Sequence, residues 1–457
     1  MAKGESSTNQ KADWIENVEA KVQWLYDYWQ THFPGTKEDK MLDMEYAIST
    51  CVVDIYAIIP EENLQSNYER AVFEYLRGSA HNAIPGVYSK KAEDHLKNAT
   101  KFNPDLQVAW NALGDCVAKK GDYSTARNCF LFVLGKKEDA RTLRHLAYLE
   151  LMCARGELEP YVPEDLEHDI PFTVPEDPQH HIEECIKYAE RAIKLKDAEG
   201  CRCYYELGSA YLTSLILDGR WSDHAILMSL EAFEKAERID TIKSEPDFQC
   251  ECGLANRLLE NYEKSLIRLS DAVEKDPAHD ASHQVEITVQ LLDKLEELVQ
   301  GKSNENRKGK SKAKSKGKGK RKSKGKSTET SFASLIQSLD DIDLDPSYNK
   351  ATLDVLAEGP NKGLAVMGVV RCLVKYEYGV PLYYVLCDSD GNSFVLLVFG
   401  IQEEAIKQGD QVTLLEPFCK FVDFKWKEKH YQFQSVRVNN VEQVLGNGKT
   451  VSSDFAI

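Results

Sequence analysis

The sequence lacks any apolar run approaching the roughly 20 residues that a bilayer-spanning helix requires. Its first ten residues, MAKGESSTNQ, also lack the apolar core of a secretion signal. We therefore expect a protein that is neither inserted in a membrane nor exported. The expected location is the cytoplasm and, in a second interpretation, the nucleus.

Sequence motifs of catalysis are missing as well. The chain has no Gly-rich phosphate loop, no His-Glu-x-x-His pair and no nucleophile elbow. The sequence therefore predicts no enzymatic activity, no cofactor and no metal. His180 and His181 stand together in a proline-rich region without an evident companion ligand, and we expect them on the surface.

The twelve cysteines lie mostly inside apolar periodic segments, which is typical of buried free thiols in a reducing compartment. Two pairs, Cys201/Cys203 and Cys250/Cys252, leave a four-thiolate zinc site open as an alternative. Only one residue separates the cysteines of each pair, whereas zinc pairs normally have two to four. We expect small buried side chains rather than a metal site.

What the sequence does contain is an internal repeat. The stretch AWNALGDCVAKKGDYSTARNCF places Trp110, Leu113, Gly114, Ala126 and Phe130 at the spacing of a 34-residue tetratricopeptide repeat. The pattern returns in YYELGSAY and in CGLANRLLENYEKSLIRLSDAVEKDP. Each repeat is a pair of antiparallel helices that buries its apolar face only against neighbours, so these segments predict one curved helical array.

Beyond residue 350 the pattern changes to short Val-, Leu-, Tyr- and Phe-rich strands separated by turns, which suits a small barrel of the oligonucleotide-binding type, the OB fold. The predicted fold class is a multidomain α+β protein, with an all-α superhelical repeat array followed by a small all-β barrel. The expected parts are N-terminal helices packing on the array (1–80), repeats with an inserted acidic, proline-rich loop at about 156–180 (81–300), a flexible Lys-rich linker (301–330), a short helix and connector (331–350) and the barrel (351–450).

A repeat array binds partners on its concave face, which the first helix of each repeat lines. Repeat positions there are mixed in charge, and arginines hold carboxylates through two parallel hydrogen bonds, so the groove suits an extended peptide that bears both an acid and a base. The alternative is ordinary solvated helix faces. Asp115 stands where a clamp for acidic chaperone tails needs an amide, which speaks against that class. The candidate groove residues are Asn111, Arg141, Arg144, Arg202, Tyr205, Asp247 and Arg257.

A basic segment, RKGKSKAKSKGKGKRKSKGK (307–326), separates the array from the barrel. It carries twelve basic residues and no acid, in a chain whose formal charge is −17, so the rest of the chain amounts to −29. Such a segment binds phosphate backbones without reading their sequence. A solubilising linker and a nuclear-localisation patch are the alternatives. The barrel has thirteen acids and ten bases from residue 351 onward, so it is not predicted to bind nucleic acid unaided.

Taken together, these features resemble one family, that of tetratricopeptide repeat protein five (Strap). The resemblance rests on YSKKAEDHLKNATKFNPDLQVAWNALGDCVAKKGD, on the extra residues after LGSAYL, on the basic segment, and on DSDG and SVRV in the barrel. It implies an adaptor that recognises the amino-terminal peptide of nascent tubulin and promotes decay of the tubulin mRNA. Implied partners are the ribosome (rRNA and proteins near the exit tunnel) and a downstream mRNA-decay adaptor. The family is also described as a nuclear, stress-responsive transcription co-activator, which is the alternative function, with transcription co-activators as partners.

The resemblance also implies roles for individual residues. Asp247 matches the groove aspartate that would pair with the basic residue of the peptide. The groove arginine expected to hold the acidic residue of the peptide aligns with Leu151, and we hypothesise that Arg144 takes its part. The residues expected to contact the ribosome or RNA are Lys308, Lys310, Lys312, Lys314, Lys316, Lys318, Lys320, Arg321 and Lys322.

Overall fold

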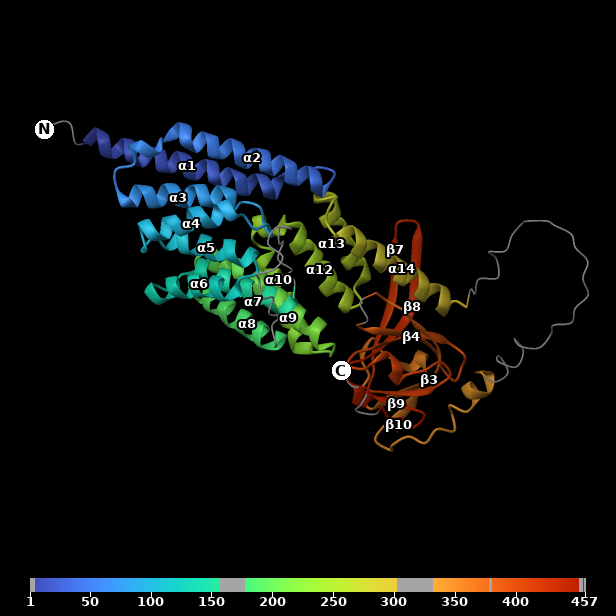
Figure 1. Ribbon diagram of the computed structural model, residues 1–457. Coiled ribbons are helices and arrows are strands. Elements are labelled where there is room, and N and C mark those ends of the chain that lie inside the picture. Colours follow the sequence, from blue (N-terminus) through green and yellow to red (C-terminus); the bar gives the residue numbers. More distant parts are fainter. Residues whose placement is uncertain (1–4, 157–176, 302–331, 378–379, 452–454, 456–457) are drawn as a thin grey trace, which may run out of the picture. The chain divides into compact units, whose positions relative to one another are not determined.

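The computed structural model describes residues 5–156, 177–301, 332–377, 380–451 and 455 (Figure 1). Within these residues, helices come first and strands follow, as the predicted fold class requires. The helices are α1 (Glu5–Thr31), α2 (Lys37–Ile58), α3 (Asn67–His81), α4 (Lys90–Phe102), α5 (Gln107–Lys119), α6 (Tyr123–Lys136), α7 (Ala140–Arg155), α8 (Pro178–Lys194), α9 (Ala198–Asp218), α10 (Asp223–Ala236), α11 (Asp240–Lys243), α12 (Pro246–Leu258), α13 (Tyr262–Lys275) and α14 (Ala281–Val299).

Many of these helices begin after a polar residue whose side chain accepts a hydrogen bond from a backbone N–H group of the first turn. Ser66 and Glu69 form a reciprocal capping box at α3, and Asp122, Asp139 and Asp177 cap α6, α7 and α8. The cap at Asp177 has a consequence for the two neighbouring histidines. Both lie in the first turns of α8 rather than in the proline-rich loop, so the loop placement is wrong, whereas His180 is exposed as expected and His181 is half-buried.

Small residues allow the two helices of a repeat to approach closely. A Cβ added at Gly114 of α5 would lie 2.6 Å from Phe130 of α6, and one added at Gly208 of α9 would lie 2.5 Å from Phe233 of α10. The absent side chain of each glycine is thus replaced by the ring of the partner helix. This packing recurs along the array, and Figure 1 shows α3 to α8 stacked side by side in chain order.

The chain folds into two compact units, and the second takes in residues from both sides of the boundary expected between array and barrel. The first unit comprises residues 1–214, 225–252 and 268–282 and holds most of the helices. Its N-terminal part has a core around Leu25, Met44 and Phe73, formed by α1, α2 and α3, and the repeat helices share another core.

The second unit comprises residues 215–224, 253–267 and 283–457 and contains the sheet. Its strand order is β10-β9-β6-β3-β4-β5-β8-β7-β2, with β1 paired to β3. Only Glu416 and Pro417 separate β6 from β7, so the path from β6 through β3, β4, β5 and β8 returns to the same bent strand, and the sheet curls on itself as in an OB fold. The strands are β1 (Asn349–Ala351), β2 (Gly359–Pro360), β3 (Leu364–Val374), β4 (Leu382–Cys387), β5 (Ser393–Val398), β6 (Gln411–Leu415), β7 (Phe418–Trp426), β8 (Lys429–Val438), β9 (Val444–Gly446) and β10 (Lys449–Thr450).

Two segments outside the strands belong to this second unit through specific contacts. The extra residues after LGSAYL extend α9 and then place Trp221 against Phe399, with ring centroids 5.0 Å apart, while the Arg437 guanidinium lies 3.9 Å from the centroid of the Trp221 ring. The segment that follows the basic stretch packs Leu339 on Met367 and Val369 of β3.

No helix among the described residues is long and apolar enough to cross a membrane.

Candidate peptide-binding groove

Charged side chains from the first helices of three successive repeats converge in the first unit. Each arginine pairs with a glutamate of a later repeat. Together with Asp247, these pairs form what we call the groove cluster: Arg144 and Arg155 of α7, Arg202 and Glu206 of α9, Glu245 before α12, and Asp247 and Glu251 of α12.

The geometry of these pairs differs from one to the next. Arg155 makes the closest paired contact with α12, with Nη2 3.0 Å from Glu251 Oε1, and its Nε donates to Thr213 Oγ1 at 2.9 Å. Arg202 Nη2 lies 3.0 Å from Glu245 Oε1. Arg144 Nη1 is 3.6 Å from Glu206 Oε1, which is an ion pair without hydrogen-bond geometry.

Asp247 is the carboxylate of the cluster that is open to a ligand, because its side chain is 79% exposed. Its Oδ1 shares a hydrogen bond of 2.8 Å with Nε2 of His279. This hydrogen bond lowers the pKa of Asp247, and the positive charges of Arg155 and Lys40 lower it further. An ionised, exposed carboxylate at this place is suited to hold a basic side chain.

Glu206 offers a second acceptor deeper in the cluster. Burial raises its pKa, although the charge of Arg144 acts in the opposite direction. Its Oε2 has no hydrogen-bond partner among the described residues. Burial raises the pKa of Glu245 in the same way. Because Oε2 of Glu206 is buried, Asp247 remains the acceptor of the cluster that a ligand can reach.

A lysine from the N-terminal helices also reaches this region. Lys40, at the start of α2, is buried over the rings of Trp29 and Phe33, and its Nζ lies 3.9 Å from Asp276 after α13. Burial lowers its pKa. Sequence reasoning missed Lys40, because the contact joins residues more than 200 positions apart and no local pattern marks it.

Three of the seven expected groove residues belong to the groove cluster: Arg144, Arg202 and Asp247. A fourth, Tyr205, lies beside the cluster. The ring of Tyr205 packs edge to face on the ring of Phe248, the residue after Asp247, with the ring centroids 5.5 Å apart. Sequence reasoning also missed Arg155. The family alignment points to Leu151, which is buried, and Arg155 follows it one helical turn later on α7.

The other three expected residues lie elsewhere. Asn111 is buried and exchanges hydrogen bonds with Thr142 of α7, whereas Arg141 is exposed in the first turn of that helix. Arg257 belongs to the second unit, where it is only 8% exposed and donates to Gln284 and Thr288 of α14. The nine basic residues expected to contact the ribosome, Lys308 to Lys322, lie outside the described residues.

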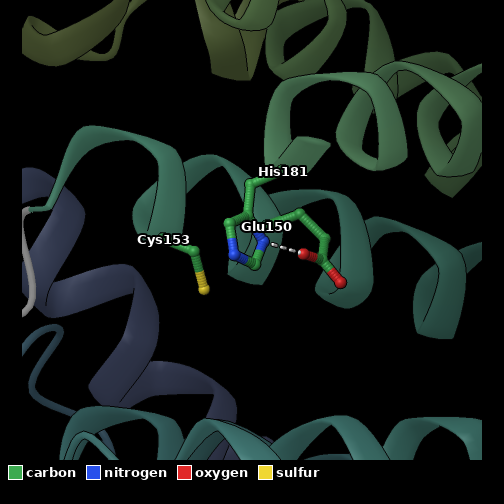
Figure 2. Close-up of side chains that lie close together, drawn as sticks. All are labelled: Glu150, Cys153 and His181. Carbon is green, nitrogen blue, oxygen red and sulfur yellow. Dashed lines mark hydrogen bonds and ion pairs between the residues drawn. The ribbon is translucent and has the colours of Figure 1, made fainter. Parts of the chain in front are cut away.

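A separate polar group links α6, α7 and α8. Glu150, Cys153 and His181 place potential metal-ligand atoms within 4.8 Å of one another, and Figure 2 shows His181 turned toward Glu150. Both Glu150 oxygens are already paired, one with His181 Nδ1 at 2.6 Å and one with Arg127 Nε at 3.2 Å. Burial raises the pKa of Cys153 to about 12. A cation here would face the Arg127 guanidinium, so we interpret the group as a polar link between helices.

Among the described residues, helix α14 covers the barrel face where OB folds usually bind oligonucleotides. That face lies on the second and third barrel strands, which are β4 and β5 here. Within the second unit, their outward side chains pack against Leu291, Leu292 and Leu295 of α14. Five aromatic residues of the barrel that could stack on bases pack either in the barrel core or in the core that includes α14. They are Tyr383, Phe394, Phe424, Trp426 and Phe433.

The sequence model described as the tetratricopeptide repeat protein 5 OB fold domain matches residues 347–457. Tetratricopeptide repeat protein 5 of Bos taurus is 29% identical over 450 residues, and that of Homo sapiens is 27% identical over 460 residues. Each alignment covers 96% of this chain and 94% of the relative. These matches support the tetratricopeptide repeat protein 5 family. The family resemblance inferred from the repeats and the barrel is thereby confirmed.

The similarity to tetratricopeptide repeat protein 5, together with the helical array, supports a repeat-based adaptor for protein interactions. Among solved structures, YrrB, described as a TPR protein with an unusual peptide-binding site, is 16% identical and covers 51% of this chain and 97% of its own. Its TM-score of 0.31 is too low to support any conclusion about the groove.

Proposed function

We propose that the groove cluster reads the amino-terminal peptide of nascent tubulin while the protein is bound to the ribosome, and that this recognition promotes decay of the tubulin mRNA. The observation that carries the proposal is the exposed Asp247, whose carboxylate is influenced by the charge of Arg155, in a cluster that also holds Arg144 paired with Glu206. A peptide with one basic and one acidic residue would pair its base with Asp247 and its acid with a guanidinium.

Arg155 supports this proposal better than Arg144 does. Both guanidiniums are already paired with glutamates, but the positive charge of Arg155 acts directly on Asp247 and lowers its pKa. One peptide could therefore engage Asp247 and Arg155 together. We propose that Arg155 takes the larger share and Arg144 a smaller one in place of the arginine that the family alignment puts at Leu151.

The test is fluorescence anisotropy of a labelled amino-terminal tubulin peptide with the full-length protein. Asp247→Asn and Arg155→Gln should each weaken binding about 10- to 100-fold, the loss expected for a charge-assisted hydrogen bond. Arg144→Gln should weaken it less. Arg238→Gln, in an exposed i,i+4 pair on the repeat surface, is the matched control and should leave binding unchanged. If Asp247→Asn binds as tightly as the wild type, the proposed groove is wrong.

Ribosome attachment is tested separately. We propose that the basic segment supplies it, because polybasic chains displace counterions from RNA. Deleting residues 302–326 should abolish salt-sensitive co-sedimentation with ribosomes, and a Gly/Ser segment of equal length should not restore it. If the deletion variant sediments with ribosomes as well as the wild type, another surface makes the contact.

A further inference from the structure

The helix α2 is apolar on two opposite sides. One side buries Met44, Ile48 and Ile55 in the N-terminal core. The other side exposes Leu42, Tyr46 and Val53 at 64%, 77% and 67%. Isolated exposed apolar residues are common, but these three are spaced by four and seven residues and therefore form one stripe along the helix.

The polar residues between Tyr46 and Val53 on α2 do not prevent a partner from covering this stripe. Ser49 and Thr50 occupy it, and their hydroxyls already donate to Glu45 O at 2.8 Å and Tyr46 O at 3.0 Å. A partner that covered them would not leave buried donors unpaired. Ala57, one turn beyond Val53, is exposed and extends the stripe toward the end of the helix.

Acidic residues border the stripe on both sides. Glu38 and Glu45 are exposed on one side; Asp43 and Asp54 lie on the other, where they already pair with His32 and Lys21. Two copies of this surface facing each other would set acids against acids, which disfavours a symmetric dimer. The basic segment of this chain matches the charge but contains no apolar residue larger than alanine, so it cannot fill the stripe.

We propose that the stripe Leu42–Tyr46–Val53 docks an amphipathic helix of a partner protein, one whose apolar side is bordered by lysines or arginines. Such a helix would place its own apolar residues at i, i+4 and i+11 over the three side chains, while its basic residues pair with the acidic borders. The adaptor would then have a second protein-binding surface, on the N-terminal helices and made of residues outside the groove cluster.

The test uses the full-length protein and an 18-residue amidated model helix of leucine and lysine, with leucines at the stripe spacing. A second peptide carries glutamate in place of each lysine. Anisotropy should show the lysine helix binding at least tenfold more tightly than the glutamate helix. Leu42→Ser and Val53→Ser should each weaken binding at least fivefold. Leu227→Ser on α10 is the matched control, since Leu227 is 63% exposed, and it should bind as the wild type does.

A charge reversal makes the test specific. The double variant Glu38→Lys/Glu45→Lys should prefer the glutamate helix, which a merely sticky surface would not do. Circular dichroism and the thermal midpoint should be unchanged in all variants, because the replaced side chains are exposed. The proposal is overturned if both helices bind equally, if Leu227→Ser weakens binding as much as Leu42→Ser, if the wild type sediments as a dimer that Leu42→Ser dissolves, or if deleting residues 307–326 creates the binding.

Discussion

At the scale of single residues, the hydrogen bond between Asp247 and His279 couples the groove to pH. Burial disfavours the charged form of His279, but the hydrogen bond and charge of Asp247 raise its pKa above the usual 6.5. The stabilisation from protonated His279 is therefore complete below pH 6.5 and is lost as the pH rises through the higher folded value. The pKa of Asp247 is lowered, so its contribution is lost only on acidification.

We therefore predict that His279→Asn reduces the free energy of unfolding more at pH 6 than at pH 9, where the neutral ring keeps its hydrogen bonds to Asp247 and Ala281. The difference at pH 6 should be at most about 1 kcal/mol, because Asp247 is exposed to solvent. Urea denaturation at both pH values measures it. A larger effect of the substitution at pH 9 than at pH 6 would reverse the sign and contradict the assignment.

The same pair predicts how peptide binding responds to pH. Protonated His279 competes with a basic peptide residue for Asp247, so the affinity for the tubulin peptide should rise as the pH increases from about 6 to 8. In His279→Asn this rise should be absent. Anisotropy titrations at several pH values provide the measurement, and a wild-type affinity that falls over this range would argue against a competing imidazolium.

Individual residues also show what the sequence could and could not predict. The repeat pattern placed Asp247, Arg144 and Arg202 on the groove face because the positions that line it recur with the helical period. The role of Lys40 could not be predicted from the sequence, because its contact with Asp276 joins distant parts of the chain. Arg155 was overlooked because the family alignment gave Leu151, although an arginine one turn later on the same helix was a usable signal.

At the scale of helix pairs, the repeat is held together by rings that fill the space left by glycines. Gly114→Ala would drive a Cβ to 2.6 Å from Phe130, and we predict a loss of about 1 to 3 kcal/mol in unfolding free energy. Gly135→Ala in the neighbouring α6 meets no atom within 4 Å and should be neutral or stabilising by up to about 1 kcal/mol. If urea denaturation gives the two variants equal stability, the packing account fails.

Sequence reasoning did not predict that α14 packs against the barrel strands. The amphipathic pattern of residues 281–299 predicts a helix with an apolar side but not the surface that the side covers. In the structure, Leu292 and Leu295 are fully buried with Tyr383 and Val395. The barrel strands were predictable because their residue types and turns are local signals, whereas the occupant of their outer face was not.

Leu292→Ala should therefore destabilise the second unit by about 2 to 5 kcal/mol, as expected for a truncated core leucine. Val355→Ala, at an exposed position of the same unit, should change its stability by less than about 0.5 kcal/mol. Thermal denaturation followed through the near-ultraviolet signal of the barrel aromatics distinguishes the two. If Leu292→Ala is as stable as Val355→Ala, the helix does not support the barrel.

At the scale of the whole molecule, positive charge is concentrated in one segment of an otherwise acidic chain. The basic segment carries twelve positive charges, and the rest of the chain is strongly acidic. The described residues that precede and follow this segment in the chain, Gly301 and Phe332, both belong to the second unit. The groove cluster belongs to the first unit. We propose that the basic segment binds the RNA surface of the ribosome while the groove cluster binds the peptide.

The most direct test of this account is selective capture of translating ribosomes. The wild-type protein is cross-linked in lysates that translate either tubulin or an unrelated protein, and the captured ribosomes are quantified from their mRNA. The account predicts at least tenfold enrichment of tubulin-translating ribosomes with the wild type. Asp247→Asn should lose this enrichment but still sediment with ribosomes. Equal capture of both kinds of ribosome by the wild-type protein would contradict tubulin recognition and leave a general ribosome-binding adaptor.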